Sequence, residues 1–151
     1  MNSDFKDLLA ILLKHKVEFL IVGGYAAIEY AEPRFTKDLD IWVGHDLQNA
    51  KHIIAALKDF GAPLFGATEA DFATPGNVLQ LGMPPVRIDI LTSIDGVEFI
   101  DAWLQRVEVD FEGVKVYIIS LEHLIKNKES TSRPRDKEEA ALLRTALKKR
   151  K

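Results

Sequence analysis

Two aspartates separated by a single residue stand in the segment Asp38-Leu39-Asp40-Ile41. Its strict alternation of polar and apolar residues predicts a β-strand, in which Asp38 and Asp40 share one face, with Cα atoms about 6.5–7 Å apart. Neighbouring carboxylates repel each other unless a cation lies between them, and hard oxygen ligands favour magnesium or manganese. The pair therefore indicates a divalent metal site. The alternative is a surface strand whose aspartates only keep it soluble.

A third carboxylate stands on a second alternating segment, Val86 to Leu91, in which Arg87 and Asp89 share the polar face. If this strand neighbours the first, Asp89 joins Asp38 and Asp40. Three carboxylates can hold two metal ions roughly 3.5–4 Å apart, an arrangement that stabilises both the attacking and the leaving oxygen of a phosphoryl displacement. Asp89 is then also the candidate general base for an attacking hydroxyl. Taken alone, Asp89 is better explained by a solvated strand.

A glycine pair, Gly23-Gly24, follows the apolar segment Val17 to Val22 and precedes a short helix predicted over Tyr25 to Ala31. Glycine lets backbone N–H groups approach an anion closely, and the start of a helix favours phosphate. The alternative is a tight turn without a ligand. No lysine and Ser/Thr follow as in a P-loop, and no third glycine completes a dinucleotide fingerprint.

Basic and polar residues elsewhere could complete a nucleotide site. Lys128 and Arg133 are candidate ligands of a triphosphate, since lysine offers a point charge and arginine a planar fork. Thr36 either orients Asp38 or caps its loop. Trp42 shares a strand face with the aspartates and could stack on a base, although core or edge packing explains it better. A solvated basic loop is the alternative for Lys128 and Arg133.

The elements that must position these residues alternate between helices and strands. The patterns predict one mixed sheet flanked by helices, an α/β or α+β fold. We expect one domain over residues 1–151, with a core over about 1–119 and C-terminal helices over about 120–151. Helices are predicted over residues 4–15, 25–31, 46–60, 96–104, 120–128 and 134–148, and strands over 17–22, 38–43, 77–81, 86–91, 107–111 and 115–119.

Composition narrows the function further. The chain has 151 residues, a net charge of -3 and no cysteine, which excludes disulfides, a thiolate zinc site and a cysteine nucleophile. The overall charge gives no basic field for tight binding of nucleic acid. No stretch approaches the roughly 20 apolar residues of a membrane span, and the N-terminus has no signal-peptide pattern, so we expect a cytoplasmic protein without membrane contact.

The joint pattern resembles the DNA polymerase β-like nucleotidyltransferases. Their signature is an apolar strand, Gly-Gly or Gly-Ser, a gap, Asp-x-Asp or Asp-x-Glu between apolar residues, and a later third carboxylate. Here 13 residues separate Gly24 from Asp38. Within the superfamily the chain is similar to small bacterial members related to abortive-infection and toxin–antitoxin nucleotidyltransferases. That narrower likeness rests on Arg-x-Thr-x-Asp at residues 34–38, the Asp89 strand, and Asn-Lys followed by Arg-Pro-x-Asp at residues 127–136.

The resemblance implies an enzyme that moves a nucleoside monophosphate from a nucleoside triphosphate to a hydroxyl of a protein, an RNA end or a small molecule, releasing pyrophosphate. The implied cofactor is Mg²⁺ or Mn²⁺, and a small helical toxin–antitoxin partner is conceivable. The alternative is an inactive binding module with the same fold. Two sets of residues follow: Asp38, Asp40 and Asp89 as catalytic metal ligands, and Gly23, Gly24, Thr36, Lys128 and Arg133 as nucleotide ligands.

One segment departs from the family pattern. The last helix of those proteins often continues Asp-x-x-Asp, whereas Asp136 is followed here by Lys137-Glu138-Glu139. The residues before Arg133 are also polar, where the family usually has a small residue and glycine. These changes concern the loop between the last two predicted helices and leave the aspartates intact.

Overall fold

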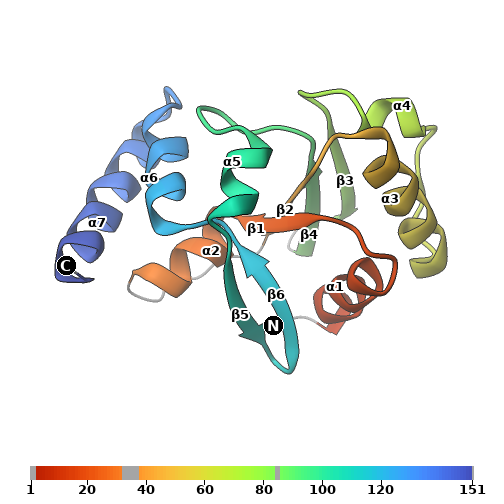
Figure 1. The fold of residues 1–151 in the computed structure, drawn as a ribbon, viewed down its shortest axis with the longest axis horizontal. Helices are drawn as coiled ribbons and strands as arrows, with labels where there is room; N and C mark the ends of the chain where they lie inside the picture. Colours follow the sequence, from red (N-terminus) through yellow and green to blue (C-terminus); the bar gives the residue numbers. More distant parts are fainter. Residues whose placement is uncertain (1–2, 32–37, 84–85, 151) are drawn as a thin grey trace.

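A six-stranded mixed sheet forms the centre of the computed structural model, which describes residues 3–31, 38–83 and 86–150 (Figure 1). The strand order is β3-β4-β2-β1-β6-β5. β2 runs parallel to β4 and antiparallel to β1, and β1 runs parallel to β6. The strands are β1 (Phe19–Val22), β2 (Asp38–Val43), β3 (Val78–Met83), β4 (Val86–Leu91), β5 (Val107–Phe111) and β6 (Val114–Ile118).

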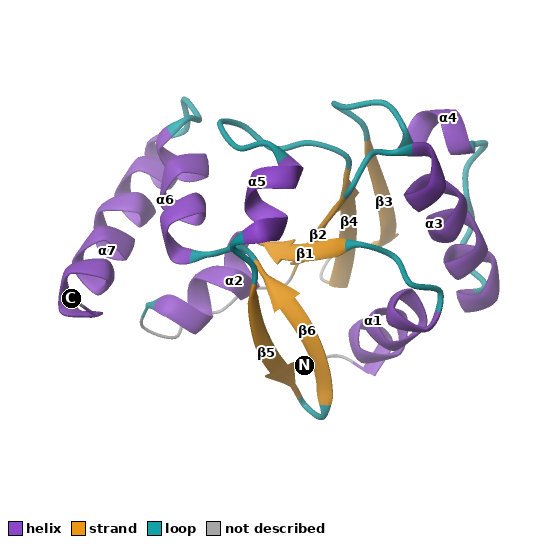
Figure 2. Cartoon of the chain, viewed as in Figure 1, coloured by secondary structure: helices purple, strands orange, loops and turns teal. Residues whose placement is uncertain are grey.

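Seven helices among the described residues surround the sheet (Figure 2). They are α1 (Ser3–Lys14), α2 (Gly23–Tyr30), α3 (Leu47–Phe60), α4 (Glu69–Phe72), α5 (Phe99–Leu104), α6 (Leu121–Glu129) and α7 (Pro134–Arg150). α1 packs against α3 at one end of the molecule, and α6 packs against α7 at the other, as Figure 1 shows. The expected mixed sheet flanked by helices is confirmed.

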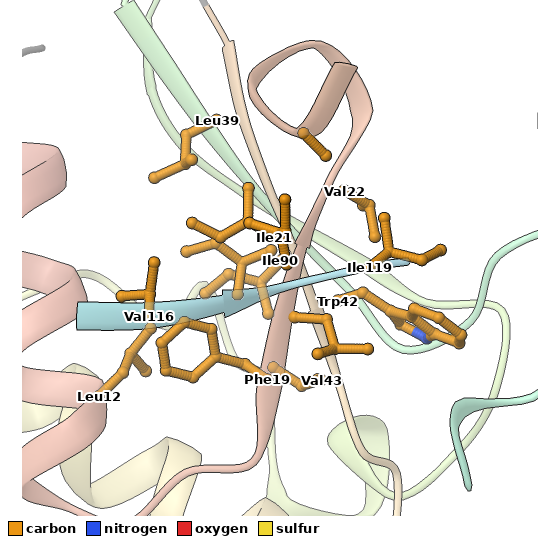
Figure 3. Packing of buried hydrophobic residues seen from close by; sticks show 14 of the residues in the cluster. Leu12, Phe19, Ile21, Val22, Leu39, Trp42, Val43, Ile90, Val116 and Ile119 are labelled. Carbon is orange, nitrogen blue, oxygen red and sulfur yellow. The ribbon is translucent and has the colours of Figure 1, made fainter. Parts of the chain in front are cut away.

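One part of the core lies between the central strands and the helices on the face away from the aspartates. Leu39 and Ile90 are fully buried there (Figure 3). Ile41 is also fully buried, as strand alternation requires when the neighbouring residues face the other side. The same alternation points Asp38 and Asp40 out of this core. Burial of apolar side chains at about 25 cal/mol per Å² holds the two strands in place and so fixes where the carboxylates stand.

Local signals set the ends of the elements. Asp46 caps α3 by accepting a hydrogen bond from the N–H of Asn49 at 2.8 Å, and Gly61 ends that helix in the left-handed conformation. Asn49 is 2% exposed; its side chain accepts from the N–H of Glu18 and donates to the carbonyl oxygens of Glu18 and Gly44. This buried amide ties the start of α3 to the chain before β1.

Three sequence predictions differ from the structure. α2 begins at Gly23, so the glycine pair is the first turn of the helix and not a loop before it. α5 begins at Phe99, because Gly96 has a positive φ and lies in a turn that an isolated bridge between Ile94 and Val97 closes. Residues 62–76, for which the sequence patterns predicted neither helix nor strand, contain the short helix α4, with a capping box at Thr68.

None of the helices in the described ranges is long and apolar enough to cross a membrane.

Candidate active site

The parallel pairing of β2 with β4 sets the candidate active site. The register places Asp40 opposite Asp89 and Asp38 opposite Arg87. Residues opposite each other on paired strands point to the same face, so the three aspartates and the arginine stand together on one side of the sheet. All four line a cavity of about 680 Å³. The structure thus brings the three predicted carboxylates to one open cavity.

Gly23 is required by its contact with Asp40. β1 pairs with β2 so that Val22 lies opposite Asp40, and the next residue, Gly23, lies against the aspartate side chain. A Cβ atom at Gly23 would be 2.2 Å from Asp40 Oδ2, and the residue has a φ of +69°. Only glycine satisfies both conditions. The sequence had suggested close approach to a phosphate; the structure adds close approach to a carboxylate.

The start of α2 also faces the cavity, which Gly23 and Gly24 line. Val22 caps the helix without a side-chain hydrogen bond, and the first turn contains no acidic residue. Backbone N–H groups at a helix start have no partner within the helix and attract anions. The glycine pair therefore presents a suitable cradle for phosphate next to Asp40.

Arg87 lies between two of the aspartates. Its Nη2 donates to Asp38 Oδ2 at 3.2 Å and to Asp89 Oδ2 at 3.3 Å, and its Nε is 3.1 Å from Asp89 Oδ1. Within the described residues it is the cation that bridges two of the three carboxylates. Strand alternation places Arg87 on the face of Asp89, but the sequence alone indicates no role for it.

The electrostatics of the aspartates reflect their crowding. The pKa of Asp40 is raised from 3.8 to about 6, chiefly by burial and then by the nearby charges of Asp89 and Asp38, while Arg87 and Lys128 lower it. Burial also raises the pKa of Asp89, with Arg87 opposing. A carboxylate that ionises reluctantly next to other carboxylates gains most from a bound cation.

The carboxylates of the cavity are suitable ligands for a divalent metal ion, although their side chains do not form a complete coordination site. Among residues 3–31, 38–83 and 86–150, no three acidic or histidine side chains already converge on one metal position. Asp89 Oδ1 is nevertheless buried and, in the part of the chain that the structure describes, meets Arg87 Nε in an ion pair without a well-aligned hydrogen bond, so a metal ion would compete only with that guanidinium for it. Hard carboxylate oxygens suit Mg²⁺ or Mn²⁺.

The opposite wall of the cavity comes from α6, α7 and the turn between them. Lys128, Arg133 and Arg135 line it, together with Asp136 and Glu139. Lys128 is 6% exposed, whereas the arginine side chains at the mouth are largely exposed. Lys128 lowers the pKa of Asp40, so its positive charge reaches across the cavity to the carboxylates.

The remaining predictions have mixed outcomes. Thr36 lies outside the described residues, as do Arg34 and Lys37. Trp42 is 1% exposed and packs edge-on against Phe99, which leaves no surface for a base and establishes the packing alternative. Glu139 is three residues after Asp136 and lines the same wall, so the second carboxylate of the Asp-x-x-Asp pattern is present as glutamate.

Two aspartates on one strand, a third on its parallel neighbour and a glycine-led helix beside them define the class of protein: a polymerase β-like nucleotidyltransferase fold. Three solved structures share it. The first is the lincosamide antibiotic adenylyltransferase LnuA in its lincomycin-bound form, with a TM-score of 0.59 and 16% identity over 97% of this chain and 98% of that one. The second is the putative nucleotidyltransferase TM1012 from Thermotoga maritima, with a TM-score of 0.56 and 17% identity over 96% of this chain and 91% of that one. The third is the antibiotic-resistance factor ANT(2'')-Ia, with a TM-score of 0.53 and 14% identity over 98% of this chain and 91% of that one.

The family follows from the sequence itself. Residues 2–151 match the family described as nucleotidyl transferase of unknown function (DUF2204), and the chain belongs to this family of nucleotidyltransferases. No curated protein sequence matches the chain.

Proposed function

We propose that this protein transfers a nucleoside monophosphate from a nucleoside triphosphate to a hydroxyl group, in a reaction that depends on Mg²⁺ or Mn²⁺. The observation that carries the proposal is the convergence of Asp38, Asp40 and Asp89 on the cavity that Gly23 and Lys128 also line. Its carboxylate wall suits metal ions, and its basic wall suits a triphosphate.

Each residue then has a role in the transfer. Asp38 and Asp40 would hold both metal ions and Asp89 the catalytic one, and the bound ions would supply the positive charge that the phosphoryl oxygens need. The acceptor oxygen attacks the α-phosphorus, the bond from that phosphorus to the bridging oxygen breaks, and pyrophosphate leaves. Asp89 takes the proton of the attacking hydroxyl, because its raised pKa makes it a better base than a free aspartate.

The nucleotide is held by the other residues of the cavity. The first turn of α2, with Gly23 and Gly24, donates backbone N–H groups to phosphate oxygens, and Lys128 and Arg133 bind the triphosphate from the opposite wall. Thr36, which precedes Asp38 in the chain, remains part of this hypothesis. The cavity volume of about 680 Å³ lies within the range of small-molecule sites, about 300–1,000 Å³.

For the acceptor, we propose a small hydroxylated molecule as the first class to test. LnuA, whose name describes adenylyl transfer to a lincosamide, aligns with 97% of this chain across 98% of its own length. The acceptor of the present protein is otherwise open, and an RNA end or a protein hydroxyl are the competing classes.

The proposal is tested by thermal denaturation with ATP, CTP, GTP or UTP, each with and without magnesium. A ligand at about 100 times its dissociation constant stabilises the folded state by about 2.7 kcal/mol. We expect one nucleotide to raise the melting temperature with magnesium, and the magnesium-dependent part of that rise to vanish in Asp38→Asn combined with Asp40→Asn. No shift with any nucleotide contradicts the proposal and favours a binding module. Labelled-nucleotide transfer to candidate acceptors then identifies the acceptor class.

A further inference from the structure

Lys128 is buried on the wall of the cavity that faces the three aspartates, and a carboxylate holds it there. Its side chain is 8% exposed and its Nζ is 2.6 Å from Glu139 Oε2, whose side chain is 12% exposed. A second carboxylate, Asp136, lies 3.7 Å away. A buried ammonium group without a negative partner is strongly destabilising, so Glu139 accounts for the presence of a charged lysine in this position.

The carboxylates of α7 are themselves fixed. Asp136 accepts a hydrogen bond from Thr131 Oγ1 at 2.7 Å. Arg133 and Arg135 reach the same two carboxylates from the mouth of the cavity, with Nε 3.0 Å from Asp136 and 3.3 Å from Glu139 respectively. Both arginine side chains are more than three-quarters exposed, and ion pairs of that kind are weak. The wall thus has one fixed cation, Lys128, and two cations that can reorient at small cost.

A nucleotide triphosphate in the cavity would compete with Glu139 for this lysine. Both are anions, both need the same ammonium group, and a phosphate at hydrogen-bond distance from Lys128 would also lie within a few ångströms of the Glu139 carboxylate. Two like charges a few ångströms apart repel about as strongly as two opposite charges at that distance attract. The repulsion between Glu139 and a phosphate therefore offsets a large part of the attraction of Lys128 for that phosphate.

We propose that Glu139 is an internal stand-in for the nucleotide phosphate. Glu139 keeps Lys128 charged and in place while the cavity has no nucleotide. When a triphosphate binds, Lys128 exchanges its ion pair with Glu139 for one with phosphate, and the loss of the first ion pair lowers the affinity for the nucleotide. Glu139 is therefore a positioning residue that acts through Lys128. The inference rests on the proposed nucleotide site and adds to it a device that regulates occupancy.

This role makes a prediction that a purely structural ion pair does not. If Glu139 competes with phosphate, its removal destabilises the nucleotide-free protein and strengthens nucleotide binding. If Glu139 only holds α7 on α6, its removal weakens both the fold and the site. Stability and affinity therefore move in opposite directions in the first case and in the same direction in the second.

The experiment compares Glu139→Gln with Glu138→Gln. Glu138 is the neighbouring residue on the same helix and is exposed, so the control makes the same chemical change without touching the cavity. Calorimetry measures binding of magnesium tripolyphosphate and of the nucleotide that stabilises the wild type. We expect Glu139→Gln to melt at a lower temperature without ligand, because Lys128 loses its charged partner. It should bind both ligands about tenfold more tightly, because the repulsion between the Glu139 carboxylate and phosphate, which solvent partly screens, is gone. Glu138→Gln should match the wild type in both respects.

Weaker binding by Glu139→Gln, or unchanged binding with lower stability, overturns the proposal. If this variant does not fold, Glu139→Asp replaces it: the shorter side chain draws the carboxylate back from Lys128, and affinity should rise by a smaller factor, whereas a fall in affinity contradicts the competition. A wild type that binds neither ligand refutes the proposed function itself, which separates the two failures.

Discussion

Replacing Asp40 with asparagine should stabilise the metal-free protein at pH 8 while abolishing its response to magnesium. Burial and the charges of Asp89 and Asp38 raise the pKa of Asp40 from 3.8 to about 6. The folded protein therefore binds a proton at Asp40 more tightly than the unfolded chain does. Asparagine has a similar shape, carries no charge and removes this unfavourable ionisation.

The sign and the magnitude follow from proton linkage. Because the pKa is higher in the folded state, the protonated carboxyl favours folding fully below about pH 3.8, and this contribution is lost as pH rises through about 6. A tenfold change in an acid constant corresponds to about 1.4 kcal/mol, so the change from 3.8 to about 6 corresponds to about 3 kcal/mol. In EDTA, the free energy of unfolding of the wild type should fall by that order between pH 4 and pH 8.

Urea denaturation in EDTA at pH 5 and pH 8 provides the measurement. Asp40→Asn should be more stable than the wild type at pH 8 by about 2–3 kcal/mol, with a smaller difference at pH 5. Asp7→Asn, at an exposed position on α1, is the matched control and should change neither value. Magnesium should then stabilise the wild type and not Asp40→Asn. If Asp40→Asn is no more stable than the wild type at pH 8, burial and the neighbouring carboxylates do not destabilise ionised Asp40, and the explanation of its raised pKa is wrong.

Three further changes probe the same cavity. Gly23→Ala should lower the free energy of unfolding in urea by more than about 2 kcal/mol, because the new Cβ adds left-handed strain and would lie 2.2 Å from Asp40 Oδ2. Gly61→Ala, at a φ of +83° with open space around it, should lower that free energy by only about 1 kcal/mol, and equal losses would refute the contact at Gly23. Arg87→Gln should melt at a lower temperature in EDTA, because the ion pairs with Asp38 and Asp89 are lost. It should bind Mn²⁺ several-fold more tightly in an electron paramagnetic resonance titration, because a competing cation is gone, and weaker Mn²⁺ binding would show that the guanidinium supports the site. Asp38→Asn combined with Asp40→Asn should bind metal-free nucleotide more tightly than the wild type in equilibrium dialysis with EDTA, because two negative charges are gone, and an unchanged or weaker affinity would contradict this charge argument.

The alternating strands were the most predictable part of this protein. The segment from Asp38 to Val43 forms a strand over those residues, because period-two alternation has no other stable solution beside a buried face. Asp89 could be placed on the cavity from sequence only through the assumption that its strand neighbours β2. That neighbourhood depends on chain crossings, which local patterns do not encode, and the structure supplies it through the parallel register.

The ion pairs of the cavity could not be predicted in the same way. Arg87 was visible on the face of Asp89, but its contact with Asp38 depends on the pairing of two strands 49 residues apart. Glu139 was passed over as a departure from Asp-x-x-Asp, and only the packing of α7 against α6 reveals that its carboxylate reaches Lys128. Trp42 shows the opposite limit, since a residue on the polar face of a strand became buried when α5 covered that part of the sheet.

Arg87 and Glu139 together explain how so many charges coexist in one cavity. The lining side chains include six carboxylates and four cations, an imbalance that would repel a triphosphate. On the sheet wall, the guanidinium of Arg87 occupies carboxylates that a metal ion would need, and on the helix wall, the carboxylate of Glu139 occupies a lysine that a phosphate would need. Each wall therefore neutralises part of its own charge. Under the proposed function, a metal–nucleotide complex would exchange both internal ion pairs for external ones, whereas metal or nucleotide alone would replace only one. The site should then favour the complex over either component, which is the selectivity that the proposed metal-dependent transfer needs.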